Sequence, residues 1–82
     1  MLQPVRMRPY RNLSGESGVR AYDMGPGFIE VEFHDRDKPY RYSSRGVGRE
    51  NVEEMKRLAL AGRGLSTFIS QHPEVKNGYD RN

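Results

Sequence analysis

The sequence has no cysteine, no long apolar run and no evident catalytic set. Without cysteine, neither a disulfide nor a thiolate zinc site can supplement the core. The longest aliphatic run is Leu58 to Ala61, which is far too short to span a bilayer, and no apolar segment near Met1 resembles a signal peptide. We therefore expect a cytoplasmic chain with no membrane contact, no metal and no cofactor.

The basic excess lies in the N-terminal part of the chain. The formal net charge is +3. Residues 1–20 carry four arginines and one glutamate, whereas the ten basic and ten acidic side chains of residues 21–82 cancel. A basic arm can attract nucleic acid by counterion release. Because residues 1–17 contain Pro4, Pro9 and Gly15 and show no apolar period, we interpret them as a disordered arm.

Three segments have the pattern of strands, namely residues 19–24, 28–34 and 40–42. The clearest runs from Phe28 to His34, where apolar and polar side chains alternate, so one face is expected to be buried and the other wet. Proline and glycine at residues 25–27 and the charged residues 35–38 favour reversing turns. These features predict a three-stranded antiparallel meander.

Two helices are predicted after a polar loop at residues 43–48. The first begins near Arg49, carries its apolar residues at core spacing and ends at Gly62 as a left-handed C-cap. The second is shorter and runs from about Leu65 to Gln71, because Pro73 stops it. The remaining residues are interpreted as a tail, in which Val75 and Tyr79 are candidate anchors.

The helices each present one apolar stripe and the sheet presents one apolar face, so an α+β domain is predicted, with both C-terminal helices across one side of the sheet. The predicted division is a disordered arm at 1–17, a single domain at 18–79 and a tail at 80–82. The predicted core comprises Val19, Ala21, Ile29, Val31, Phe33, Tyr40, Tyr42, Val52, Met55, Leu58, Ala59, Leu65, Phe68 and Ile69. A domain of 82 residues is near the lower limit for folding on such a core alone.

Three motifs in order resemble a family. They are Phe28-Ile29-Glu30-Val31-Glu32-Phe33, Tyr40-Arg41-Tyr42 and Gly62-Arg63-Gly64, followed by Phe68 in the second helix. This order is similar to that of the KTSC-type domain, a small module named from the C-terminus of some lysyl-tRNA synthetases and also found as short stand-alone bacterial and phage proteins. The resemblance covers roughly Val19 to Tyr79. It implies the α+β fold and, through the synthetase link, association with RNA, but it implies no established reaction.

The chain departs from the family pattern at two places. Gly46-Val47-Gly48 stands where the family often has a valine-proline pair before its first helix. Gly64-Leu65-Ser66-Thr67 stands where the family often has an aromatic residue and an asparagine after the glycine-arginine turn. Any role of that asparagine in relatives therefore has no counterpart residue here.

Two groups of residues are candidate contacts for phosphate or nucleic acid. Arg63, Ser66 and Thr67 stand at the start of the second helix, where backbone N–H groups, a hydroxyl and a guanidinium could hold a phosphate. Ordinary N-capping by Gly64 or Ser66 is the simpler interpretation. The second group is Arg41, Arg45 and Arg49. Arg41 would contact RNA on the outer sheet face, unless it forms cross-strand ion pairs with the glutamates there.

The two histidines have structural interpretations that we prefer to chemical ones. His34 precedes Asp35 and Asp37 in a predicted hairpin, where a solvated turn is favoured over a metal site. His72 closes the second helix, where packing or capping is favoured over catalysis. A Ser66–His72 dyad is disfavoured because residues six apart lie on different faces of a helix.

The leading hypothesis is therefore a small non-enzymatic binding or accessory module, a stand-alone KTSC-like domain whose partner is RNA or another protein. The alternative is a protein–protein interaction module that does not bind nucleic acid. An enzyme is the third class considered, and it would need Arg63, Ser66 and His72 to meet in one cleft.

Overall fold

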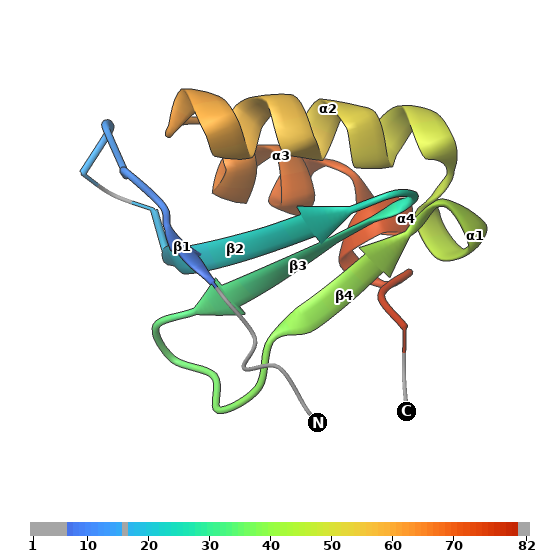
Figure 1. Cartoon of the computed structure of the whole chain (residues 1–82), viewed down its shortest axis with the longest axis horizontal. Coiled ribbons are helices and arrows are strands. Elements are labelled where there is room, and N and C mark those ends of the chain that lie inside the picture. The colour runs from blue at the N-terminus through green and yellow to red at the C-terminus, as the bar shows by residue number, and fades with distance from the viewer. Residues whose placement is uncertain (1–6, 16, 81–82) are drawn as a thin grey trace.

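The computed structural model describes residues 7–15 and 17–80 (Figure 1). Its strands form one antiparallel sheet in the order β1-β2-β3-β4. In chain order the elements are β1 (Arg8–Pro9), β2 (Val19–Gly25), β3 (Phe28–Phe33), β4 (Tyr40–Ser43), α1 (Ser44–Val47), α2 (Arg49–Ala61), α3 (Leu65–Gln71) and α4 (Pro73–Lys76). The α+β class is confirmed, but the sheet has one strand more than predicted. Two short helices, α1 and α4, are present in addition to the two predicted ones.

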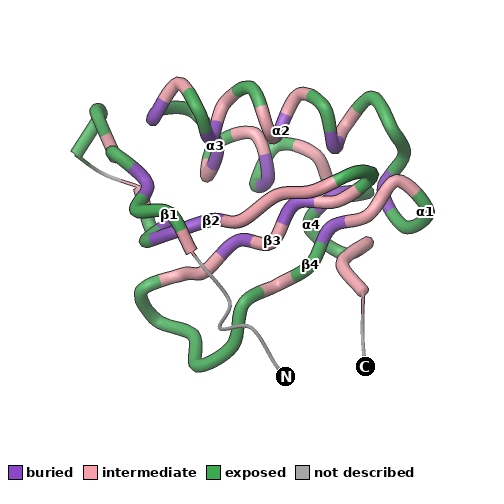
Figure 2. The backbone as a smooth tube through the Cα atoms, in the orientation of Figure 1, coloured by how far each residue is buried: buried purple, intermediate pink, exposed green. Residues whose placement is uncertain are grey.

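Alternation along β3 sets the two faces of the sheet. Ile29 and Val31 are fully buried beneath the helices, while Glu30 and Glu32 lie on the opposite face. Figure 2 shows the buried residues concentrated where the sheet and the helices meet. The register pairs Glu30 with Arg41 of β4, so these two residues share the outer face.

An irregularity in β2 changes which of its residues face the core. The pairing with β3 shifts between Val19 and Ala21, and beyond it Tyr22 lies opposite Val31. Tyr22 is therefore a core residue, although it was not predicted to be one. Ala21 is buried, but it pairs with Glu32 and Pro9 and belongs to the other face. A bulge inserts one residue and so inverts the alternation that a uniform strand would have.

The predicted disorder of residues 1–17 is wrong for the described residues 7–15 and 17; residues 1–6 and 16 lie outside the description. β1 pairs with β2, and Tyr10 next to it is 6% exposed and belongs to the core. The Arg11 guanidinium donates to the carbonyl of Leu60, and the N–H of Leu13 donates to the carbonyl of Gly62 at 2.7 Å. These bonds satisfy carbonyls at the end of α2, which is why a segment without apolar period still docks.

Helices α2 and α3 begin and end as predicted. Val52, Met55 and Ala59 of α2 are buried, as the stripe predicted. Gly62 ends α2 in the left-handed conformation, with φ at 77°, and its N–H bonds to the carbonyls of Leu58 and Ala59.

The loop predicted at 43–48 and the tail predicted after Pro73 each contain one helical turn. The Ser43 side chain accepts from the N–H of Gly46 and so caps α1. Pro73 stops α3 but occupies the first turn of α4, where its missing N–H is tolerated. Val75 is fully buried and the half-buried Tyr79 packs against the core, so both predicted anchors are confirmed.

The core differs from prediction at its edges. Residues that join it without having been predicted are Tyr10, Tyr22, Val47 and Val75. Four predicted members are only partly buried and pack against it, namely Phe33, Tyr40, Leu58 and Phe68. In the described part of the chain, no helix has the length and apolar character needed to cross a membrane.

Candidate functional site

A cleft of about 530 Å³ opens on the helix side of the sheet. Its lining residues come from the hairpin that joins β3 to β4, from helix α3 and from the segment that follows α4. Its aromatic and cationic lining residues are Phe33, Tyr40, Tyr42, Tyr79, Arg36 and Lys76. The cleft borders the hydrophobic core, because the core residues Tyr42 and Ile69 line it.

The rings of the cleft contact one another in a continuous group. The centroids of Tyr40 and Tyr79 lie 4.5 Å apart, with their planes tilted by 50°. Phe33 meets Tyr40 edge-on at 5.7 Å, and Tyr42 meets Tyr79 edge-on at 6.4 Å. Such offset and edge-on pairs are the favoured geometries of aromatic rings. Phe33, Tyr40 and Tyr79 are half-buried and line the cleft.

Tyr42 forms the buried end of this group, at 2% exposure. The pKa of its phenol lies far above the ordinary value, chiefly because the group is buried and to a smaller extent because Tyr40 and Tyr79 are close. The hydroxyl of Tyr42 is therefore protonated at neutral pH.

The rim of the cleft carries two cations and one carboxylate. The Arg36 guanidinium lies 6.0 Å from the centre of the Tyr40 ring, and its Nε is 3.9 Å from Asp35. That ion pair is long and both side chains are exposed, so it contributes little. Lys76 ends α4 and also lines the cleft, and no ion pair engages it in the described part of the chain. The rim is thus cationic overall.

Two hydrogen bonds of Asp80 and the close fit of Gly78 hold the intervening residue, Tyr79, in the cleft. The N–H of Asp80 donates to the carbonyl of Arg41 at 2.8 Å, and the Ser43 hydroxyl donates to the Asp80 carboxylate at 3.1 Å. Gly78 passes so close to other backbone that an added Cβ would lie 2.4 Å from the carbonyl oxygen of Glu74. Only glycine fits there, which fixes the path of the chain into Tyr79.

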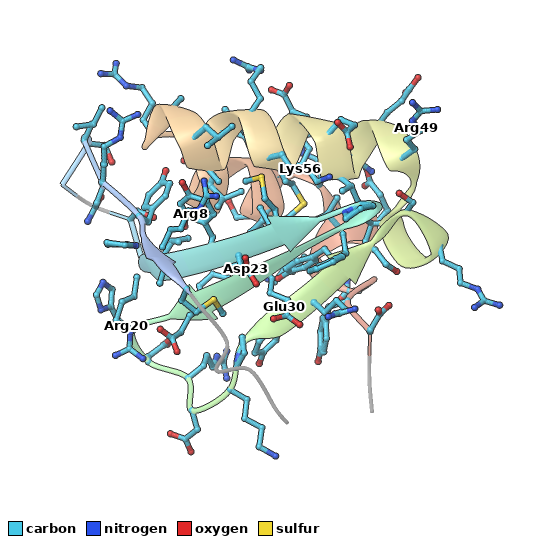
Figure 3. The ribbon with its side chains drawn as sticks, in the orientation of Figure 1. Arg8, Arg20, Asp23, Glu30, Arg49 and Lys56 are labelled. Atoms are coloured by element: carbon cyan, nitrogen blue, oxygen red, sulfur yellow. The ribbon has the colours of Figure 1, made fainter. Side chains whose placement is uncertain are left out.

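The outer face of the sheet carries Arg41, one of the predicted contacts. Its Nε donates to Glu30 at 2.9 Å and its guanidinium lies 4.1 Å from the centre of the Phe28 ring. A second pair, Arg20 with Glu32 at 3.1 Å, lies on the same face. Figure 3 shows Glu30 beside Asp23 on this face, with Arg20 at its end. The predicted ion pairs are confirmed, and because Asp23 shares the face, three carboxylates there face two arginines.

The other predicted contacts are scattered. Arg45 lies in α1 and Arg49 at the start of α2, and both are exposed (Figure 3 labels Arg49). Arg63 is exposed in the turn between α2 and α3. Ser66 lines both the aromatic cleft and a smaller hollow of about 220 Å³, and Thr67 lines only the hollow. The structure therefore does not bring the six predicted residues together.

The start of α3 has a simple capping arrangement. Gly64 is the N-cap, and because glycine has no side chain, no side-chain hydrogen bond from this position caps the helix. The hollow beside it is lined by hydroxyls of Ser14, Ser17, Ser66 and Thr67. The interpretation as N-capping by Gly64 is confirmed.

Both histidines have the structural roles that were preferred. His34 is exposed just after the end of β3, and its backbone N–H donates to the carbonyl of Gly18. The His72 ring stacks on Phe68 with centroids 4.0 Å apart, and its Nδ1 lies 2.7 Å from the Phe68 carbonyl. No hydrogen bond joins His72 to Ser66. Within residues 7–15 and 17–80, no group of three or more acidic or histidine side chains could hold a metal ion.

Sequence reasoning missed the cleft because its residues were assigned elsewhere. Phe33 and Tyr40 were counted as core, Tyr79 as an anchor, Arg36 as part of a reversing turn and Lys76 as part of the tail. No pattern within a single element marks the cleft, because its lining comes from the β3–β4 hairpin, α3 and the segment after α4.

Comparison with known proteins gives no relative for this chain: no family model, no curated protein and no solved structure matches it.

Proposed function

We propose that this chain is a small non-enzymatic binding module of the KTSC-like type that contacts single-stranded RNA as an accessory to other machinery. The observation that carries the proposal is the aromatic cleft with its two rim cations, Arg36 and Lys76. Half-exposed aromatic rings beside cations are what single-stranded nucleic acid needs, since bases stack on rings and phosphates pair with cations.

The distribution of charge supports the same partner. The outer sheet face neutralises its own arginines, as the pairs of Arg20 and Arg41 show. At the cleft, by contrast, Lys76 is engaged by no ion pair within residues 7–15 and 17–80, and Arg36 has only its long pair with Asp35 at 3.9 Å. Such cations release counterions from RNA on contact.

The non-enzymatic character is supported by how the polar side chains of the chain are used. The Nδ1 of His72 is engaged by a backbone carbonyl, and the hydroxyl of Ser70 in the cleft donates to the carbonyl of Thr67 at 3.0 Å. These groups serve the helix ends. A general base would need a free, oriented nitrogen within reach of a substrate proton.

The experiment is an amide NMR titration of the chain with mixed short RNA at about 50 mM and about 200 mM salt. We expect localised shift changes in residues 33–42 and 69–80 that weaken as the salt concentration rises. An unchanged spectrum at the lower salt concentration would refute the proposal.

A second candidate function is contact with a protein, and a separate observation favours it. Leu13 and Leu60 are the large apolar side chains exposed in the described residues, at 53% and 51%. Both lie at the end of α2 where the N-terminal segment crosses it, because Leu13 bonds to Gly62 and Arg11 to Leu60. Shifts confined to this end upon addition of a partner protein, with none upon addition of RNA, would favour this candidate over the first.

A further inference from the structure

We infer that the aromatic cleft binds one unpaired nucleotide, with its base against Tyr79 and Tyr40 and its flanking phosphates on Arg36 and Lys76. This inference rests on the proposed function and names the place and the chemistry of the contact. It assigns the specificity of the module to strand ends, loops and bulges of RNA rather than to duplex.

The rings define a seat for a planar group. Tyr40 and Tyr79 lie 4.5 Å apart at a tilt of 50°, so the two rings contact each other, and a base would stack on a ring face at the cleft and not between the rings. Phe33 abuts Tyr40 edge-on and fixes its orientation, and Tyr42 does the same for Tyr79. Rings that are packed against one another lose little entropy when a base stacks on them.

The volume limits how much can enter. At about 530 Å³ the cleft lies in the lower half of the range of pockets that bury a small organic molecule, which is roughly 300–1,000 Å³. That size suits one nucleotide and excludes a helical stem. A base within an A-form duplex is stacked on both faces, whereas a base in a single strand can be splayed out onto aromatic side chains.

The cations come from two separate segments of the chain. Arg36 belongs to the β3–β4 hairpin and Lys76 to the end of α4, and both line the cleft together with the rings. A strand with its base on the rings therefore has two cations of the same cleft available to its phosphates. Asp35 is the one carboxylate of the lining, and it opposes these contacts.

Two contacts with phosphates set the dependence on salt. For single-stranded nucleic acid each neutralised phosphate adds roughly −0.7 to the slope of log K against log salt concentration, so two give about −1.4. Loss of one cation should reduce the magnitude of the slope by about 0.7. Stacking of the base on the rings is insensitive to salt, so it should remain in a variant that lacks either Arg36 or Lys76.

The test is fluorescence anisotropy of the full chain with a labelled single-stranded RNA of about eight nucleotides, beside a duplex of the same composition. Tyr79→Leu keeps an apolar side chain but removes the stacking ring, and we expect it to weaken binding about 5- to 150-fold, equivalent to about 1–3 kcal/mol. Lys76→Gln should weaken binding and reduce the salt slope. Arg45→Gln and Arg49→Gln, exposed arginines outside the cleft, are the matched controls and should change affinity less than twofold.

A variant with a gain of affinity separates this inference from loss of folding. Asp35→Asn removes the rim carboxylate and should tighten binding about two- to fivefold, because an exposed charge interaction is worth about 0.5–1 kcal/mol. Asp37→Asn is the control, since Asp37 lies in the same hairpin but does not line the cleft.

The outcomes distinguish the two proposals. If RNA binds but Tyr79→Leu, Lys76→Gln and Asp35→Asn leave its affinity unchanged, this inference is overturned while the proposed function stands. Equal affinity for duplex and single strand would also overturn it. If the wild-type chain binds neither RNA at about 50 mM salt, both proposals fail.

Discussion

The docking of the N-terminal segment can be tested at one residue, Tyr10. Its ring is 6% exposed within the core, and its hydroxyl accepts a hydrogen bond from the N–H of Leu65 at 3.3 Å. Leu65 begins α3, so its N–H has no partner within the helix. Tyr10 therefore joins the core and caps a helix at the same time.

Two substitutions separate these contributions. Tyr10→Phe keeps the ring and leaves the N–H of Leu65 without its acceptor, which should reduce the free energy of unfolding by about 1 kcal/mol. Tyr10→Ala also removes the ring, and large aromatic truncations in a core cost about 3–5 kcal/mol. A domain of this size has an unfolding free energy on the order of 5–10 kcal/mol, so Tyr10→Ala should remove a large part of it.

Urea denaturation followed by circular dichroism measures both effects. Leu13→Ala is the matched control, because Leu13 belongs to the same segment but is 53% exposed, and it should change stability by less than about 0.5 kcal/mol. If Tyr10→Ala is as stable as this control, the segment does not dock in solution, and the interpretation of residues 1–17 as a disordered arm would be right after all.

Two further predictions concern the C-terminal segment and the buried phenol. Gly78→Ala places a Cβ 2.4 Å from the Glu74 carbonyl oxygen and 2.8 Å from Val47, so it should lower the free energy of unfolding by roughly 1–3 kcal/mol. Gly18→Ala is the control, because a Cβ there meets nothing within 4 Å and stability should not change. Equal melting temperatures of the two variants would contradict this prediction. Burial raises the pKa of Tyr42, so its contribution to stability is complete below the pKa of the unfolded phenol, near 10, and is lost as the pH rises above it. Denaturation at increasing alkaline pH should show this loss, and Tyr42→Phe should lessen it; an unchanged alkaline slope in that variant would show that another group is responsible.

Local patterns were sufficient to predict the central part of the fold. The alternation in β3 predicted both its faces, and the stripe of α2 with the glycine at its end predicted that helix. These features depend on neighbours within one element, so a single sequence contains them. The same reasoning predicted the ion pairs of the outer face, because Glu30 and Arg41 must face the same way once β3 and β4 pair.

Features that depend on distant contacts were not predictable in this way. Tyr10 is buried because the end of α2 offers free carbonyls to its neighbours, and nothing within residues 7–15 indicates that. The bulge in β2 exchanges the roles of Ala21 and Tyr22 without a glycine or proline to mark it. The cleft arises where α3 and α4 fail to cover Tyr40, which requires knowledge of how three separate segments pack.

The central claim is that an RNA base lies against the rings of the cleft. The most direct measurement is a search for intermolecular nuclear Overhauser effects between base protons of a short single-stranded RNA and the ring protons of the bound protein. We predict Overhauser effects from the base to the rings of Tyr79 and Tyr40 in the wild-type chain. In Tyr79→Leu, we predict that the effects to Tyr40 and the other cleft rings disappear. Effects absent from every cleft ring, with amide shifts confined to Arg45, Arg49 or Arg63, would contradict the account.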